Sequence, residues 1–141
     1  MILLDTNVLS ELTRLSPNLA VVQWLETNEQ LLALPSIALA ELRYGIARLP
    51  AGRRRSRLLE FWNATRDRFV GRTYAFDERA AEAYGDLAAA AERRGTRVNV
   101  ADGQIAAIAL VHRMSVATRD AGDFKATGVR IVNPWALDSP R

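Results

Sequence analysis

Short apolar runs alternate with longer stretches of helical periodicity along the chain, a pattern typical of parallel strands separated by helices. The apolar run at residues 2–4 predicts a buried strand, and the run at 31–34 predicts a second strand. Residues 73–76, 115–118 and 129–132 are further strand candidates. The run at 31–34, which precedes Pro35, also fits a helical turn. We expect an α/β fold with a central, mostly parallel sheet of about four to five strands and helices on both faces.

The intervening stretches predict helices, at residues 6–12, 18–28, 36–49, 51–69, 77–94 and 99–113. Ser36 and Asn99 are residue types that favour the N-cap position, where a side-chain oxygen accepts a bond from a free backbone amide. Pro50 and Gly95 are typical helix stops. We expect Ser36 and Asn99 to cap their helices.

The composition is that of an ordinary globular protein. The 141 residues are 49% hydrophobic and 25% charged, and no repeat or linker is visible, so a single domain over 1–141 is expected. No apolar run approaches the roughly 20 residues of a membrane helix, and an acid at position 5 interrupts the first run. We therefore expect a cytoplasmic protein without a membrane anchor.

The residue counts exclude several kinds of catalytic and metal site. The absence of Cys excludes disulfides, thiolate catalysis and Cys-ligated zinc, and the single histidine, His112, cannot form a cluster. The formal net charge of +3, with a sequence pI of about 9.9, permits a nucleic-acid partner without establishing one. No phosphate-binding or dinucleotide-binding glycine motif and no nucleophile elbow is present.

Four acids from remote segments point to one edge of the predicted sheet. Ligands of parallel α/β sheets bind outside the carboxyl ends of the strands. Asp5 directly follows the first strand and Asp120 follows a later one, while Glu41 lies in the second turn of the helix after the second strand. The helix that carries Asp102 must run antiparallel to the strand at 115–118, so it begins at this edge.

Each acid alone also has an ordinary structural explanation. Asp5 could cap the helix that follows it, Asp102 could complement a helix dipole, and Asp120 could be a turn residue. Glu41 is harder to dismiss, because its helix is apolar almost all round and a lone carboxylate there would need a partner.

A cluster of carboxylates destabilises a fold by mutual repulsion, but it is well suited to bind a cation. Two carboxylates about 5 Å apart repel by roughly 3 kcal/mol at an effective dielectric near 20. With no Cys or His cluster, the donor set favours a hard ion, Mg²⁺ or Mn²⁺. Such an ion could activate water for in-line attack on a phosphodiester.

At these residues the sequence resembles the PIN-domain ribonucleases, specifically the VapC-type toxins of bacterial toxin–antitoxin pairs and their FitB-like group. The match spans nearly the whole chain. Its blocks are Leu4-Asp5-Thr6-Asn7-Val8-Leu9-Ser10-Glu11, Ser36-Ile37-Ala38-Leu39-Ala40-Glu41-Leu42-Arg43-Tyr44-Gly45, Val100-Ala101-Asp102-Gly103-Gln104-Ile105-Ala106-Ala107, Ala117-Thr118-Arg119-Asp120 and Asp123-Phe124.

The resemblance implies a PIN-like fold and RNA cleavage that depends on Mg²⁺ or Mn²⁺. The catalytic and metal-binding acids would be Asp5, Glu41, Asp102 and Asp120. The polar residues around them would be Thr6, Asn7, Thr118 and Asp123, of which Asp123 could assist or replace Asp120. The family often has Asn at the position of Asp120.

The resemblance also implies partners. These are a small VapB- or FitA-like antitoxin, a second copy of the chain in a homodimer, and operator DNA bound by a higher assembly with the antitoxin. In the family the two helices flanking Pro50 form an arm that grips the antitoxin and helps dimerisation.

An arginine-rich stretch adjoins an apolar and aromatic stripe in the second of these helices. The stripe consists of Leu58, Leu59, Phe61 and Trp62. One interpretation is a solvated arginine face over a buried stripe. Another is that the stripe binds the antitoxin, and a third is that Arg53, Arg54, Arg55 and Arg57 bind RNA.

Two other functions compete with the nuclease. A phosphotransfer domain would need a second Asp two residues after the first and a Lys after a later strand. Position 7 is Asn, and Lys125, the single lysine, lies beyond the turn that carries Asp120. A PIN module that has lost catalysis and only binds RNA or a partner is disfavoured, because all four acids are present.

Overall fold

The computed structural model describes residues 1–137, and its centre is a five-stranded parallel sheet. The strand order is β3-β2-β1-β4-β5, and each pair of neighbours is parallel. The strands are β1 (Ile2–Leu4), β2 (Leu32–Pro35), β3 (Thr73–Tyr74), β4 (Ser115–Ala117) and β5 (Ile131–Val132). The predicted α/β sheet is confirmed, with strands shorter than expected at both of its edges.

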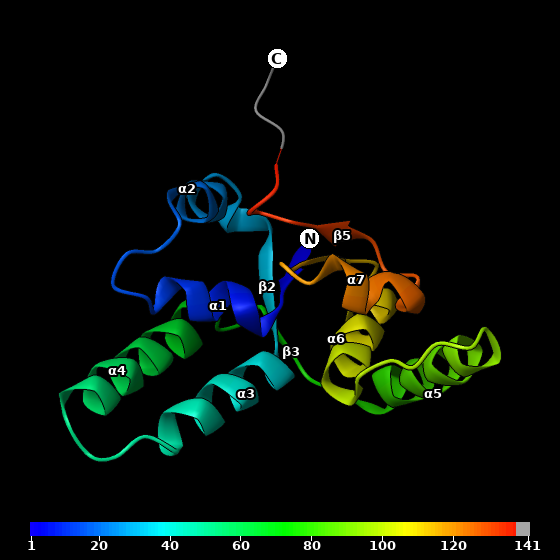
Figure 1. Ribbon diagram of the computed structural model, residues 1–141, viewed down its shortest axis with the longest axis horizontal. Helices are drawn as coiled ribbons and strands as arrows, with labels where there is room; N and C mark the ends of the chain where they lie inside the picture. Colours follow the sequence, from blue (N-terminus) through cyan, green and yellow to red (C-terminus); the bar gives the residue numbers. More distant parts are fainter. Residues whose placement is uncertain (138–141) are drawn as a thin grey trace.

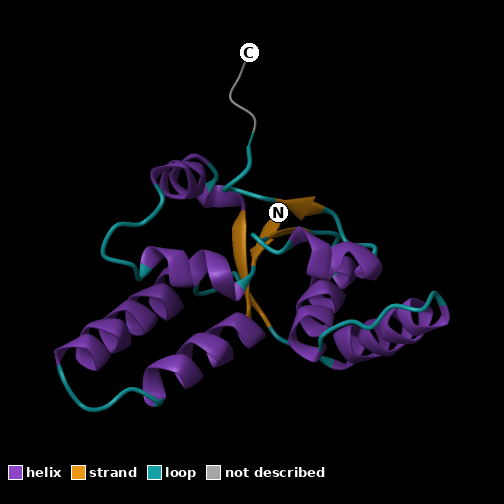
Figure 2. Cartoon of the chain, viewed as in Figure 1, coloured by secondary structure: helices purple, strands orange, loops and turns teal. Residues whose placement is uncertain are grey.

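Helices cover both faces of the sheet (Figures 1 and 2). One layer contains α1 (Thr6–Leu12), α2 (Leu19–Thr27), α3 (Ser36–Ala47) and α4 (Arg53–Arg68). The other layer contains α5 (Glu78–Arg93), α6 (Val100–Val111) and α7 (Ala121–Phe124). Two 3-10 turns, η1 (Glu29–Leu31) and η2 (Lys125–Thr127), complete the described elements.

The alternation of side chains along β1 divides the core in two. Leu3 pairs with Ala33 and Val116 in the neighbouring strands, and all three contribute to the apolar cluster beneath α5, α6 and α7. Leu4 pairs with Ala117, and both belong to the cluster beneath α1 to α4. Consecutive residues of a strand point to opposite faces, so this central strand is buried on both sides.

Of the two predicted N-caps, one is confirmed and one is wrong. The Asn99 side chain accepts hydrogen bonds from the amides of Ala101 and Asp102, at 3.0 and 3.3 Å, which confirms it as a cap. The predicted cap at Ser36 is wrong. Pro35 occupies the N-cap position, Ser36 is the first helical residue, and no side chain caps this helix. The fixed φ of Pro35 already sets the turn from strand to helix.

Two helices end earlier than predicted. The helix after β2 ends at Ala47, and α6 ends at Val111. Arg113 has a left-handed φ of 56°, which turns the chain out of α6 toward β4. No helix within residues 1–137 is both long and apolar enough to cross a bilayer.

Candidate metal centre

Asp5 ends β1 and begins α1, and both of its carboxylate oxygens are bound by protein donors. Oδ1 accepts the amide of Thr6 at 2.8 Å, which makes Asp5 the N-cap of α1. Oδ2 accepts the hydroxyl of Thr118 at 2.8 Å. The side chain is buried. Asp5 is therefore a helix cap and a member of the acidic edge at once.

The Thr118 hydroxyl connects Asp5 to Asp120. It is fully buried, and it accepts hydrogen bonds from the Asp120 amide at 3.0 Å and from Asn7 Nδ2 at 3.2 Å. Because both acceptor positions of the hydroxyl are filled, its one proton must point at Asp5. Asn7 Nδ2 also donates to Asp120 Oδ2 at 3.1 Å. The orientation of both carboxylates is thus fixed by a polar network.

Glu41 reaches the same edge from α3, but its surroundings differ from the expectation. Its Oε1 accepts the Thr6 hydroxyl at 2.7 Å. Although the helix is apolar almost all round, α3 buries only the stripe Ala38, Leu42 and Ile46, and the expected partner of the lone carboxylate is the Thr6 hydroxyl. Glu41 is exposed, and the helix lies at the surface with α1 and α4 along one side. The carboxylate is therefore free to reach a ligand from the solvent side.

Asp102 lies in the first turn of α6 and is half-buried. Burial, followed by repulsion from the carboxylates of Asp5, Asp123, Glu41 and Asp120, raises the pKa of Asp102 to about 6. Burial also raises the pKa of Asp5, against the hydrogen bonds from Thr118 and Thr6 that lower it. All four predicted acids therefore lie within electrostatic range of one another, joined by Asp123.

Asp120 and Asp123 have different neighbours at this edge. Asp120 is bonded to Asn7, whereas Asp123 repels Asp102 more strongly than Asp120 does. Asp123 and Asp102 together line a polar cavity of about 260 Å³. Asp123 is thus the closer electrostatic neighbour of Asp102, and Asp120 belongs to the network of Asp5.

The donor chemistry of the acidic edge fits a hard divalent cation. Every side chain in it offers oxygen, and the mutual repulsion of the carboxylates is relieved by a positive charge. Among residues 1–137, however, no three acidic or histidine side chains stand close enough together to hold one ion as they are placed. As the side chains are placed, a metal ion would be held by fewer than three of them, with water as its remaining ligands, which is the usual coordination of Mg²⁺ in proteins.

The predicted partner stripe of α4 is half-buried within the chain itself. Leu58, Leu59, Phe61 and Trp62 pack against the core cluster beneath α1 to α4. The indole of Trp62 donates to the Leu39 carbonyl at 2.9 Å, and the Arg43 guanidinium lies 4.7 Å from its ring centre. Trp62 therefore has a structural role in joining α3 to α4.

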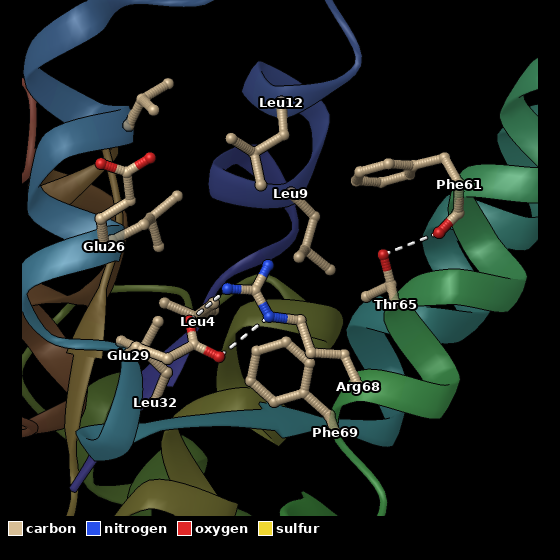
Figure 3. Close-up of a pocket in the computed structure, with 12 residues that line it drawn as sticks. Leu4, Leu9, Leu12, Glu26, Glu29, Leu32, Phe61, Thr65, Arg68 and Phe69 are labelled. Carbon is tan, nitrogen blue, oxygen red and sulfur yellow. Dashed lines mark hydrogen bonds and ion pairs between the residues drawn. The ribbon is translucent and has the colours of Figure 1, made fainter.

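Phe61 faces a different environment. It lines an apolar cavity of about 170 Å³ between α1, α2 and α4 (Figure 3). Leu9 and Leu12 of α1 line the same cavity, and the ion pair between Glu29 and Arg68 lies beside it. An apolar cavity with a polar border can accept an apolar side chain of a partner.

Glu11 is a buried acid to which the sequence analysis assigned no role. Its carboxylate accepts the Asn18 amide at 2.9 Å and the Arg14 guanidinium at 3.3 Å. The Asn18 bond and the Arg14 charge lower the pKa of Glu11 despite its burial. The signal available in the sequence was a charged residue inside the apolar repeat of a short helix. Glu11 holds the connection from α1 to α2.

The comparisons with known proteins agree with the geometry. A family model for the PIN domain matches residues 2–129. The VapC ribonuclease Y4jK of Sinorhizobium fredii is 44% identical over 140 residues, covering 96% of this chain and 98% of that protein. The toxin FitB of Neisseria gonorrhoeae is 43% identical over 137 residues, covering 96% and 99%.

Solved structures show the same similarity. A chain in the structure of FitAB bound to a DNA fragment matches with a TM-score of 0.92 and 42% identity, and the match covers all of both chains. The chain thus belongs to the PIN-domain family, within its group of VapC- and FitB-type toxins.

Proposed function

We propose that this protein is an endoribonuclease toxin that hydrolyses RNA phosphodiesters with Mg²⁺ or Mn²⁺. The observation that supports this most directly is the convergence of the four acids at one sheet edge. There Asp5 is oriented by Thr118, and Asp102 carries a raised pKa because of its acidic neighbours. Such a set of oxygens binds a hard cation and the phosphate that the cation attracts.

The roles follow from position. Asp5, which is buried, and Asp102, which is half-buried, would hold the ion, directly or through its water ligands, together with the exposed carboxylates of Glu41 and Asp120. The bound ion would activate water and offset the charge that develops on the phosphate. Asp123 adds negative charge beside Asp102.

Three polar side chains hold these acids in place. Thr118 orients Asp5, Thr6 orients Glu41, and Asn7 orients Asp120. Partners of this kind fix the direction of a ligand's lone pairs, and losing one typically costs about 10–100-fold in metal affinity or activity.

We further propose that an antitoxin of the VapB or FitA type binds this chain, because the matched solved structure is a FitAB complex on DNA. The apolar cavity beside Phe61 would take an apolar anchor of the antitoxin. A homodimer and a larger assembly on operator DNA belong to the same proposal. The protein would act in the cytoplasm, where RNA is found.

The test is an RNA-cleavage assay with Mn²⁺ on purified protein freed of antitoxin. Asp5→Asn and Asp102→Asn should each reduce cleavage by at least about 100-fold, because each removes a ligand charge without changing volume. Asp86→Asn, which changes an exposed acid of α5, is the matched control and should cleave at the wild-type rate. Full activity in Asp5→Asn, Glu41→Gln and Asp102→Asn alike would exclude the metal-nuclease function.

A further inference from the structure

A groove leaves the acidic edge and runs between α1, α3 and α4. Its first part is a cavity of about 200 Å³ that begins at Thr6 and Glu41 and is lined farther along by Thr13, Arg54 and Leu58. A second cavity of about 310 Å³ shares these last three residues. The two cavities are therefore adjacent, and we call them together the Arg54 groove.

The charge along the Arg54 groove changes sign. Glu41 stands at its acidic end, hydrogen-bonded to Thr6. Arg14, Arg54 and Arg57 line the other part. Arg14 is paired with Glu11, whereas neither Arg54 nor Arg57 takes part in an ion pair within residues 1–137. The far part of the groove thus presents net positive charge to any ligand that starts at the acids.

The lining of the groove suits an extended polymer with regularly spaced negative charges, such as single-stranded nucleic acid. The hydroxyl residues Ser10 and Thr13 and the apolar residues Leu49 and Leu58 all line its first part. Single-stranded nucleic acid is bound by grooves that combine positive charge along the backbone with surfaces for the bases. A metal ion at the acids would attract one phosphate, and the arginines would attract those that follow it.

We propose that the Arg54 groove holds the single-stranded RNA that flanks the cleaved bond, with Arg54 and Arg57 binding its phosphates. This inference rests on the proposed nuclease function and adds the path of the substrate. The inference assigns RNA binding to some of the arginines at the start of α4 and not to others. Arg54 and Arg57 line the groove, whereas Arg53, also exposed, lines neither cavity.

The experiment compares Arg54→Gln and Arg57→Gln with Arg53→Gln, the matched control one residue away on the same helix. RNA binding is measured in the cleavage-deficient Asp5→Asn background over a series of salt concentrations. Each groove substitution should weaken binding about five- to tenfold at low salt and reduce the slope of log K against log[salt] by about 0.7. The Arg53→Gln variant should bind like its parent.

Substrate length provides a second readout, in the otherwise wild-type chain. The loss of cleavage in Arg54→Gln should be large on a single-stranded RNA of about ten nucleotides. It should vanish on a dinucleoside monophosphate, whose single phosphate is the one that is cleaved, so that no flanking phosphate is left for Arg54 to bind. The Arg54→Lys variant, which keeps the charge, should retain most of the activity on the longer RNA. Melting temperatures confirm that the variants are folded.

The possible outcomes distinguish a failure of the proposed RNA path from a failure of the proposed nuclease function. If the wild type cleaves RNA but Arg54→Gln and Arg57→Gln behave like Arg53→Gln, the groove is not the path and the nuclease function stands. If the two variants lose antitoxin affinity with RNA binding unchanged, the groove belongs to the antitoxin and the inference is overturned. If the wild type neither binds nor cleaves RNA, both proposals fail together.

Discussion

The hydroxyl of Thr118 donates to Oδ2 of Asp5 across 113 residues of sequence. The register of the sheet creates this contact, since Leu4 of β1 pairs with Ala117 of β4 and the next residue of each strand leaves the sheet at the same edge. The hydroxyl also receives two hydrogen bonds, so it cannot rotate away from the carboxylate. A single threonine therefore fixes the central acid of the site.

Removing this hydroxyl should impair the site with little loss of fold. Thr118→Val preserves the shape of the side chain but leaves Asp5 Oδ2 and the Asp120 amide without their partner. We expect Mn²⁺ affinity and RNA cleavage to fall about 10–100-fold. Thr65→Val, which removes another buried threonine hydroxyl in α4, is the control and should keep wild-type cleavage. Equal activity of the two variants would show that the Thr118 contact has no role in catalysis.

The pKa of Asp102, raised to about 6 from the ordinary 3.8, predicts how stability depends on pH without metal. Between these values the native state keeps a proton that the unfolded state has released, so the free energy of unfolding falls as the pH rises through this window. Asp102→Asn removes the effect. Because Asp102 is half-exposed, we expect only about 1 kcal/mol of added stability at pH 7.

Urea unfolding of the metal-free protein at pH 4, 5, 6 and 7 measures this difference. The wild type should lose stability relative to Asp102→Asn as the pH rises, and the two curves should converge at pH 4. A constant difference between them at all four values would contradict the raised pKa.

Metal binding should stabilise the folded protein by offsetting the repulsion among the acids. At a hundredfold excess over its dissociation constant, Mg²⁺ should add roughly 2.7 kcal/mol to the free energy of unfolding. Thermal melts with and without Mg²⁺ or Mn²⁺ measure the effect, with Asp5→Asn as the variant that should lose it. A wild-type melt that no divalent cation changes would show that the acids do not form a metal site.

Glu11 should show the opposite pH dependence to Asp102. Its pKa is lowered from the ordinary 4.5, so the stability it contributes is present above that value and is lost as the pH falls through the native pKa. Glu11→Gln should cost about 1–2 kcal/mol at pH 7, because the charged hydrogen bonds to Arg14 and Asn18 are weakened. The cost should shrink on acidification, as followed by urea unfolding between pH 2.5 and 7. A cost that grows on acidification would rule out the lowered pKa.

Two residues of the partner stripe of α4 should have different functions, one in antitoxin binding and the other in stability. Phe61→Ala should weaken antitoxin binding by about 30-fold or more, since Phe61 lines the open apolar cavity. Trp62→Phe should change affinity less than threefold and mainly lower the melting temperature, because it removes the hydrogen bond to Leu39. Calorimetric titration with antitoxin tests both, and a larger affinity loss in Trp62→Phe would reverse the assignment.

The sequence predicted the architecture well because the central strands are buried on both faces. Residues 2–4 and 32–34 are continuous apolar runs with no alternation, and Val116 and Ala117 are consecutive apolar residues after Ser115. Only a sheet covered on both sides buries such runs. The outer strands are different. Thr73 and Tyr74 make up all of β3, since residues 75 and 76 have no strand partner within the described chain. Pairing length at a sheet edge depends on neighbours that local sequence does not encode.

The sequence indicated which acids would meet at this edge, and the resemblance indicated the polar residues around them, but neither indicated the hydrogen bonds that join them. The carboxyl-edge rule brought Asp5, Glu41, Asp102 and Asp120 to one side, which the electrostatic coupling of Asp102 supports. The bond between Thr118 and Asp5 depends on β4 lying next to β1, and strand order cannot be deduced from periodicity. The exposure of Glu41 was missed for a related reason, since an apolar composition does not reveal which side of a helix lacks a neighbour.

The place of β1 at the middle of the sheet also has a consequence for synthesis. During translation the N-terminal strand emerges first, yet one of its two neighbours, β4, is made only at residues 115–117. Until the ribosome has passed Thr118, Asp5 lacks the hydroxyl that orients it, and Asp120 has not been made. A chain arrested before Asp120 therefore cannot complete the acidic edge, and under the proposed function it would not cleave RNA.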